Sequence, residues 1–276
     1  MCGKKSFSFC ATLLLLTTAA CVELDEVSKW AAESTKADSS LSDLAADLKH
    51  SCERFNTFRP EGAEPRDCSQ YDQLGTSVLV AQSVLLNYMQ VLGSVASDKA
   101  VTFQGSLNGL PGQLAPAGWD ANEVTATTSL VDKTFEAAVN GYRRKKLTDL
   151  VGSTNADVQN VSNKLAAIIG KDYKQLLQNE SDQMENFYQD ALHNAPANQG
   201  LDKLLVVNLW NQQKASLAEK SSAADAYVKM ITSIATGHQK LYDHRNDMGA
   251  KQLMSDLGPE IQDISSSAMD VYKAFK

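Results

Sequence analysis

The spacing of apolar residues constrains this chain more than any other feature, because that spacing is helical almost throughout. A stripe at steps of three and four residues puts apolar side chains on one face of a helix. The cleanest stripe runs without a break through Leu74, Val78, Ala81, Leu85, Tyr88, Leu92 and Val95. No segment shows the alternation of apolar and polar residues that a half-buried strand requires. The sequence therefore predicts an all-α protein.

The same periodicity divides the chain into a few long helices. We expect them at about 24–55, 74–95, 120–151, 155–193, 201–242 and 253–271. The first stripe weakens between Ser34 and Asp38, Gly152 is expected to end the third helix, and Gly258-Pro259 should kink or restart the last one. Helices of roughly 30 to 45 residues are about 45 to 65 Å long. The sequence predicts one domain, an elongated antiparallel bundle of about five or six long helices.

Two of the five cysteines, Cys52 and Cys68, enclose a polar segment that contains Pro60, Gly62 and Pro65. This composition is typical of a loop, which would join two antiparallel helices. A disulfide across such a loop stabilises a protein by about 3 kcal/mol in the chain-entropy model. Two free thiols or a metal-binding pair are the alternatives. The absence of CxxC spacing and of a third ligand nearby favours the disulfide.

The first 20 residues have the pattern of a secretory signal peptide. Lys4 and Lys5 precede an apolar run from Phe7 to Leu16, and the small residues Ala19 and Ala20 follow it. The run is shorter than the roughly 20 residues that a membrane span needs. No later apolar stretch reaches that length, so we expect no transmembrane helix in the mature chain.

Cys21 comes directly after the small residues, and this arrangement resembles the lipobox of bacterial lipoproteins. The resemblance implies cleavage before Cys21, a diacylglycerol on its sulfur and an acyl chain such as palmitate on its amine. Several acyl chains give stable membrane anchoring. The family prefers Leu where this chain has Thr18, and ordinary secretory cleavage with Cys21 left free is the alternative.

The resemblance also implies a location in the bacterial cell envelope. It divides the chain into a signal peptide, residues 1–20, and a lipid-anchored domain, residues 21–276. Val22 stands where Asp favours retention in the inner membrane. We therefore expect the outer membrane, with the domain facing the periplasm. This oxidising compartment is compatible with a disulfide.

The mature domain is acidic. Without Lys4 and Lys5, 24 basic and 33 acidic residues remain, a formal charge of −9. Such a protein is a poor general binder of nucleic acid, which needs basic surface. The one concentrated basic patch is 143–146, Arg-Arg-Lys-Lys. Its expected role is a solvated helix face, and the alternative is contact with anionic lipid headgroups or an acidic partner.

Residues 100–118 contain four glycines and two prolines but remain apolar, with Phe103, Leu107, Leu110 and Leu114. Because a solvated linker would not carry these side chains, we expect an ordered cap over one end of the bundle. A loop that binds a partner or touches a membrane is the alternative.

The sequence contains no motif that predicts an enzyme, a metal site or a cofactor. A phosphate-binding loop, GxSxG and HExxH are all absent. Asp47 and His50, like Asp190 and His193, have the spacing of one helix face. They carry Asp where di-iron bundles carry Glu, and they lie near predicted helix ends. We interpret them as surface polar residues and predict no catalytic residue and no metal ligand.

Two further features bear on binding. His238 falls on an apolar stripe, which is typical of a core histidine with a hydrogen-bond partner; the alternative is a ligand site formed with Tyr227. The run from Leu204 to Trp210 is apolar on all sides, so it is either central in the bundle or covered by another chain. The central position is the expected one.

These observations favour a non-enzymatic, lipid-anchored envelope protein that acts through protein–protein contact. An assembly accessory, an inhibitor and a scaffold are all compatible with this class. The alternative is a small-ligand-binding or sensor bundle with a cavity near His238 and Tyr227. An enzyme of unfamiliar type and a membrane-inserting toxin-like bundle are less favoured, the latter because the chain is acidic and lacks a long apolar hairpin.

Overall fold

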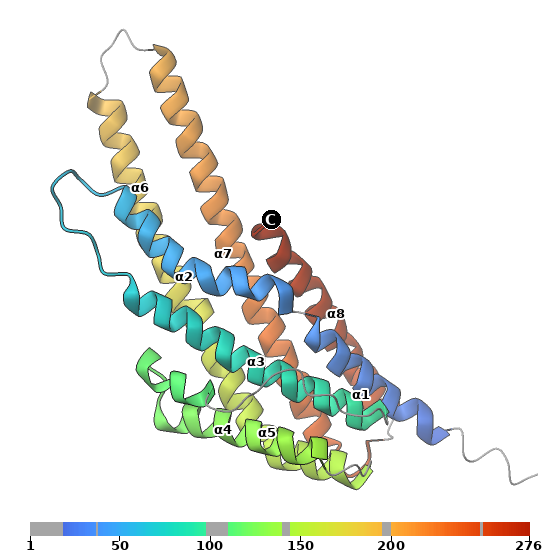
Figure 1. Ribbon diagram of the computed structural model, residues 1–276. Coiled ribbons are helices and arrows are strands. Elements are labelled where there is room, and N and C mark those ends of the chain that lie inside the picture. The colour runs from blue at the N-terminus through green and yellow to red at the C-terminus, as the bar shows by residue number, and fades with distance from the viewer. Residues whose placement is uncertain (1–18, 37, 98–109, 140–143, 195–199, 249–250) are drawn as a thin grey trace, which may run out of the picture.

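The chain folds into an elongated bundle of long helices, shown in Figure 1 as a computed structural model. The structure describes residues 19–36, 38–97, 110–139, 144–194, 200–248 and 251–276. Within these ranges there is no strand, and the predicted all-α class is confirmed.

The elements follow one another in a simple order. The α-helices are α1 (Ala19–Thr35), α2 (Asp38–Thr57), α3 (Ser69–Ser97), α4 (Ala121–Val139), α5 (Arg144–Ala167), α6 (Lys174–Asn194), α7 (Gly200–Asp243) and α8 (Lys251–Ala274). Two 3₁₀ turns, η1 (Leu110–Gln113) and η2 (Ala115–Ala117), precede α4. A π-helical segment, η3 (Ile168–Tyr173), joins α5 directly to α6.

Helix α3 is the central element of the core. It packs against α1, α2, α4 and α5, and its apolar stripe is buried in these contacts. By length and composition α3 could cross a membrane, with a mean hydropathy of 1.5 over 18 residues. This corrects our expectation that no later stretch is long and apolar enough. Of that window, 61% is buried inside the bundle, as in the core helix of a folded domain.

Several predicted helix boundaries are wrong. The first predicted helix is in fact two, α1 and α2, which separate where the stripe weakens. The third ends at Val139, and α5 continues through Gly152. A glycine inside a helix costs only about 1 kcal/mol, which tertiary packing offsets. That packing includes an ion pair between Lys133 of α4 and Asp157 of α5, with 2.8 Å between Nζ and Oδ2.

Helix α8 runs through Gly258 and Pro259, so it does not restart there as one alternative predicted. A proline inside a helix removes one backbone hydrogen bond and costs about 3 kcal/mol. Helix α8 offsets this cost by packing against α7 and α1, and its residues Leu257 and Ile264 are fully buried.

The loop between α2 and α3 carries the predicted disulfide. Cys52 and Cys68 are bonded, with an S–S distance of 2.06 Å, and this prediction is confirmed. Asn56 orders the same loop, because its amide donates to the Arg66 carbonyl and accepts from the Arg66 backbone N–H. The loop therefore holds the end of α2 beside the start of α3.

The segment expected to cap the bundle is described only from residue 110. Phe103 and Leu107 lie outside the described residues. Leu114 is fully buried, and the η1 and η2 turns pack on α3. Trp119 is also buried and donates from Nε1 to the Ser77 hydroxyl at 3.0 Å. The described part of this segment is therefore an ordered cap.

One close helix contact gives a stability prediction. A Cβ atom on Gly237 of α7 would lie 2.3 Å from Nε1 of Trp30, whereas a Cβ on Gly152 would lie 3.7 Å from Cδ of Arg245. Gly237→Ala should lower the free energy of unfolding by about 1 to 3 kcal/mol through overpacking. Gly152→Ala should raise it by up to about 1 kcal/mol through helix propensity. Denaturant unfolding of both variants tests this, and equal effects would contradict it.

Candidate functional site

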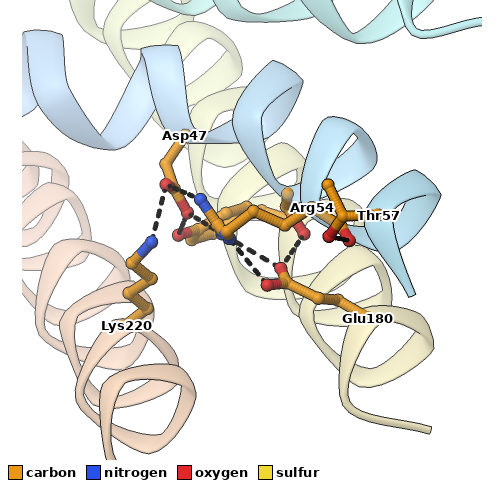
Figure 2. A network of polar contacts seen from close by, with 7 residues as sticks. Asp47, Arg54, Thr57, Glu180 and Lys220 are labelled. Carbon is orange, nitrogen blue, oxygen red and sulfur yellow. Dashed lines mark hydrogen bonds and ion pairs between the residues drawn. The ribbon is translucent and has the colours of Figure 1, made fainter. Parts of the chain in front are cut away.

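A cluster of charged side chains is buried between α2, η3, α6 and α7. We call Asp47, Ser51, Arg54, Tyr173, Glu180 and Lys220 the buried charge network, and Figure 2 shows its centre. The Asp47 and Glu180 side chains are only 6% and 1% exposed. Two carboxylates and two cations balance, so the network is electrically neutral.

Arg54 is the centre of the network, because its guanidinium bridges both carboxylates. Its Nη1 and Nη2 donate to the two oxygens of Asp47 at 2.7 and 2.9 Å. Its Nε and Nη2 donate to the two oxygens of Glu180 at 2.6 and 3.0 Å. Such bidentate, charge-assisted hydrogen bonds are stronger than neutral ones. Arg54 therefore fixes α2 against α6.

Three further donors form hydrogen bonds with the two carboxylates. Lys220 Nζ lies 2.8 Å from Asp47 Oδ1, and the Tyr173 hydroxyl donates to Asp47 Oδ2 at 2.7 Å. The Ser51 hydroxyl donates to Glu180 Oε2 at 2.7 Å. Each carboxylate thus has three or more donors, which is what keeps a buried charge from being strongly destabilising.

The local sequence explains how these residues meet. Asp47, Ser51 and Arg54 are four and then three residues apart, so they share one face of α2. The π segment η3 changes the helical phase between α5 and α6, because each π turn holds more residues than an α turn. Gly170 lets this segment lie close to α7, since a Cβ there would be 2.9 Å from Val228 Cγ2.

The network shifts the ionisation of its members. Burial alone would raise the pKa of Asp47, but hydrogen bonds and charge from Arg54 and Lys220 outweigh it and lower that pKa. Burial would lower the pKa of Arg54, and the two carboxylates raise it instead. Burial and the neighbouring Asp47 raise the pKa of Tyr173. Asp47 and Arg54 are therefore both charged at neutral pH.

Beyond this network, α6 and α7 project from the bundle as a helical hairpin (Figure 1). We call residues 189–194 of α6 and 200–210 of α7 the distal arm. Aromatic rings lie at its base. The ring centroid of Phe58, the residue after α2, lies 5.6 Å from that of Phe187 and 5.9 Å from that of Tyr188. Tyr188 in turn stacks on Trp210 at 6.1 Å.

The distal arm carries an exposed apolar surface on α7. Its members are leucines that are 83%, 58%, 59% and 43% exposed: Leu201, Leu204, Leu205 and Leu209. We call these four residues the apolar patch. Single exposed leucines are ordinary, but a contiguous group marks an interaction surface.

The apolar patch corrects the expectation that the run from Leu204 to Trp210 is central in the bundle. Trp210 is half-buried, and the leucines before it face solvent. The reason is length: α6 and α7 extend beyond the ends of α2 and α8, which would otherwise cover them (Figure 1). The alternative, that another chain covers this run, stays open.

His238 is a fully buried core residue whose two ring nitrogens both have protein partners. A chain of hydrogen bonds that begins at Asp243 sets their directions, because a carboxylate can only accept. Gln239 Nε2 donates to Asp243 Oδ1 at 2.8 Å, and Gln239 Oε1 accepts from Asn155 Nδ2 at 2.7 Å. Asn155 Oδ1 therefore accepts from His238 Nδ1 at 2.9 Å, and His238 Nε2 accepts from the Tyr88 hydroxyl at 2.6 Å. These hydrogen bonds fix a neutral ring.

The other predicted positions lie apart from one another. Tyr227 is fully buried, with its hydroxyl 3.5 Å from Gln82 Oε1. The ligand site predicted at Tyr227 and His238 stays a prediction. Both side chains are fully buried, so neither has a surface exposed to solvent. Cys21 belongs to the first turns of α1. Of the basic cluster, position 143 lies outside the described residues, and Lys146 is half-buried.

The interpretation of the two Asp–His pairs as surface polar residues is wrong for Asp47, which is buried. Asp47 belongs to the buried charge network, whereas His50 is exposed. Asp190 and His193 are both exposed near the end of α6. Among the described residues, no three His, Cys, Asp or Glu side chains are grouped so that they could hold a metal ion.

A groove of about 660 Å³ between α4 and α5 is lined by three carboxylates, but each has a partner. Asp120 accepts from the backbone N–H groups of Asn122 and Glu123 at the start of α4. Glu123 pairs with Lys164 at 3.0 Å, and Asp157 pairs with Lys133. The carboxylates of this groove therefore serve helix capping and helix packing.

Comparison with known proteins gives no relatives. No protein-family model matches the chain, and no curated protein or solved structure is significantly similar to it.

Sequence reasoning missed the buried charge network, although a signal for it exists. Glu180 interrupts the apolar stripe of Leu176, Leu177 and Met184 as His238 interrupts its own stripe. A lone acid on a buried stripe requires a cation, and Arg54 lies on the polar edge of the α2 stripe. Which cation pairs with which acid depends on helix packing.

The network gives a second prediction. Glu180→Gln keeps the side-chain shape but leaves part of the Arg54 charge uncompensated. It should lower the free energy of unfolding by about 2 to 4 kcal/mol, since Arg54 is partly exposed. Asp182→Asn, at an exposed position on α6, is the control and should change it by less than about 0.5 kcal/mol. Thermal unfolding of both variants is the measurement; similar melting temperatures would mean that the network contributes little.

The neutral His238 gives a third prediction, on pH. Burial lowers the pKa of His238 from 6.5 to about 3, so between these values the unfolded chain binds a proton that the folded chain does not. The stability of the wild type should therefore fall as the pH drops from 6.5 to 5, by roughly 1 kcal/mol per pH unit. His238→Gln should remove this slope, whatever its effect at pH 7. Urea unfolding at several pH values tests it, and parallel slopes would contradict it.

Proposed function

We propose that this chain is a non-enzymatic, lipid-anchored protein of the bacterial envelope, and that it acts through protein–protein contact made by its distal arm. The observation that carries the proposal is the apolar patch, which lies on a projecting hairpin. The anchor rests on the lipobox resemblance at Cys21, and the outer membrane is the expected site.

The position of the distal arm relative to Cys21 supports this proposal. Trp30 of α1 packs on Gly237, near the end of α7 that is remote from the distal arm. The 37 residues of α7 between Gly200 and Gly237 span about 55 Å. The apolar patch and the start of α1 therefore lie at opposite ends of the molecule (Figure 1). A chain anchored at Cys21 would extend the distal arm away from its own membrane.

The state of the polar groups supports a binding role over a catalytic one. The buried acids and His238 are used in fixed hydrogen bonds within the core, and the carboxylates of the α4–α5 groove have partners as well. Their arrangement stabilises the bundle, whereas the exposed leucines contribute nothing to its core. Burial of these leucines by a partner would therefore supply binding free energy at the distal arm.

Two measurements test membrane anchoring at Cys21 and partner contact at the distal arm. Cys21→Ser should move the protein from the membrane fraction to the soluble fraction and abolish the acyl mass. A photoreactive residue at position 205, in the patch, should give a crosslinked protein adduct in intact envelopes. The same residue at position 269 on α8, where Met269 is 53% exposed, is the matched control. A soluble wild type contradicts the anchor, and the absence of any adduct at position 205 contradicts the role of the arm.

A further inference from the structure

We propose that the Cys52–Cys68 disulfide is a redox-sensitive latch, which exchanges with an external dithiol through Cys68 and so controls how firmly the base of the distal arm is held. The contacts of Cys68 and of the last turns of α2 carry this inference. Its consequence for partner binding rests on the proposed function.

The two cysteines of the disulfide differ in their access to solvent. Cys52 lies on α2 and is 1% exposed, whereas Cys68 is half-buried between the exposed residues Asp67 and Ser69. An external thiolate therefore has access to Cys68 and not to Cys52. Since thiol–disulfide exchange depends on which sulfur is attacked, this difference makes Cys68 the attacked residue and Cys52 the leaving group.

The surroundings of Cys68 stabilise negative charge on its sulfur. Cys68 directly precedes α3, and its backbone carbonyl accepts from the N–H groups of Tyr71 and Asp72 at 3.1 and 3.2 Å. The positive end of the α3 dipole therefore lies at this residue, and a helix N-terminus favours a thiolate. Asn56 Nδ2 also donates to Cys68 Sγ at 3.5 Å. Cys68 thus has the surroundings of a cysteine that takes part in exchange.

Two acidic side chains near Cys68 oppose this effect. The Asp67 carboxylate accepts from the backbone N–H and the hydroxyl of Ser69, at 2.9 and 3.0 Å. The Asp72 side chain is 62% exposed and lies 3.7 Å from Lys49 Nζ. Exposed charges of this kind are screened by solvent and salt, whereas the donor from Asn56 contacts the sulfur directly. The stabilising contacts therefore dominate.

The exchange reaction balances with a dithiol as the reductant. One of its thiolates attacks the Cys68 sulfur, the Cys52–Cys68 bond breaks, and Cys52 leaves as a thiolate that takes a proton from solvent. The second thiolate of the reductant then attacks the reductant's own sulfur in the mixed disulfide. This step closes the reductant to a cyclic disulfide and releases Cys68, which is protonated in turn. Two electrons and, through solvent, two protons pass from the dithiol to the protein.

The turn of α2 that carries Cys52 also holds α6. Ser51 and Arg54, on either side of Cys52 in the sequence, both donate to Glu180 of the buried charge network. In the oxidised chain the disulfide fixes this turn to the start of α3. The reduced chain lacks that covalent link, so only noncovalent contacts position Arg54 between its two carboxylates.

The contact between α2 and α6 continues to the base of the distal arm. The ring of Phe58 packs against those of Phe187 and Tyr188, and Gln183 Nε2 donates to the Phe58 carbonyl at 3.0 Å. Phe58 lies inside the loop that the disulfide closes. Reduction opens this loop, so we expect the contacts of Phe58 with α6 to open more often in the reduced chain.

The latch gives the base of the distal arm a firmly held oxidised state and a looser reduced state. A partner that binds an ordered surface pays less conformational entropy, so the oxidised chain should be the form that binds. In an oxidising compartment the disulfide persists until a protein with an exposed dithiol reduces it. The oxidation state would thereby regulate the contact made by the distal arm.

The first experiment tests exchange in the folded full chain, with glutathione as the monothiol probe. After acid quenching and alkylation, peptide masses should place glutathione on Cys68 at least about tenfold more often than on Cys52. The rate should change by less than about twofold in urea below the unfolding transition, because the exchange needs no unfolding. Equal labelling of the two cysteines, or a rate that rises steeply with urea in this range, overturns the inference.

The second experiment compares amide hydrogen exchange of the oxidised full chain with that of the same chain reduced by dithiothreitol. Reduction should speed exchange about tenfold in residues 183–194 of α6 and change it less than about twofold in residues 121–139 of α4, the matched control. Cys52→Ser with Cys68→Ser should reproduce the reduced pattern without a reductant. Unchanged exchange at 183–194, or an equal rise in α4, overturns the latch.

The photocrosslink at position 205 separates the latch from the proposed function. An adduct that forms with the oxidised chain and falls at least about fivefold on reduction supports both. Equal adduct yields in the two states overturn the control of binding by the disulfide and leave the proposed function intact. No adduct in either state contradicts the proposed function, and hydrogen exchange at 183–194 then supports or overturns the latch by itself.

Discussion

The arrangement of the helices around α2, α6 and α7 depends on one side chain, the guanidinium of Arg54. It holds two buried carboxylates from different helices in a fixed geometry, Asp47 from α2 and Glu180 from α6. Lys220 of α7 is linked to the same network by its hydrogen bond to Asp47. Because a buried charge is strongly unfavourable without its partner, few other arrangements of these helices satisfy all four charges. The network thereby fixes the base of the hairpin that carries the distal arm.

The distal arm follows from this constraint and from helix length. Helix α7 has 44 residues, whereas α2 and α8 have 20 and 24. Helix α8 packs along only part of α7, and α2 packs on α6, so the first turns of α7 lie outside the bundle. Two paired helices bury the surfaces between them and leave their outer sides exposed. The leucines on that outer side therefore stay exposed to water unless a partner covers them, and this is the physical basis of the proposed function.

Much of the fold could be predicted from the periodicity alone. The helical class, the span of α7 and the bonded Cys52–Cys68 pair all agree with the structure. The errors occur where local and tertiary signals compete. Gly152 ends a helix by local propensity, yet the packing of α4 against α5 keeps it inside one. For the same reason α8 continues through Pro259, and the buried surface against α7 outweighs the lost hydrogen bond.

The sequence by itself determined the helical class and which side of most helices is apolar, because these depend on spacing along the chain. It also predicted, by resemblance, a leader and a lipid site at Cys21. Only the tertiary structure decided whether each apolar side is buried or exposed. The stripe with His238 and the run before Trp210 are both apolar in sequence, but one is buried among four helices and the other is exposed on the distal arm. The difference is set by which helices are long enough to reach them, and that depends on contacts between residues far apart in the chain.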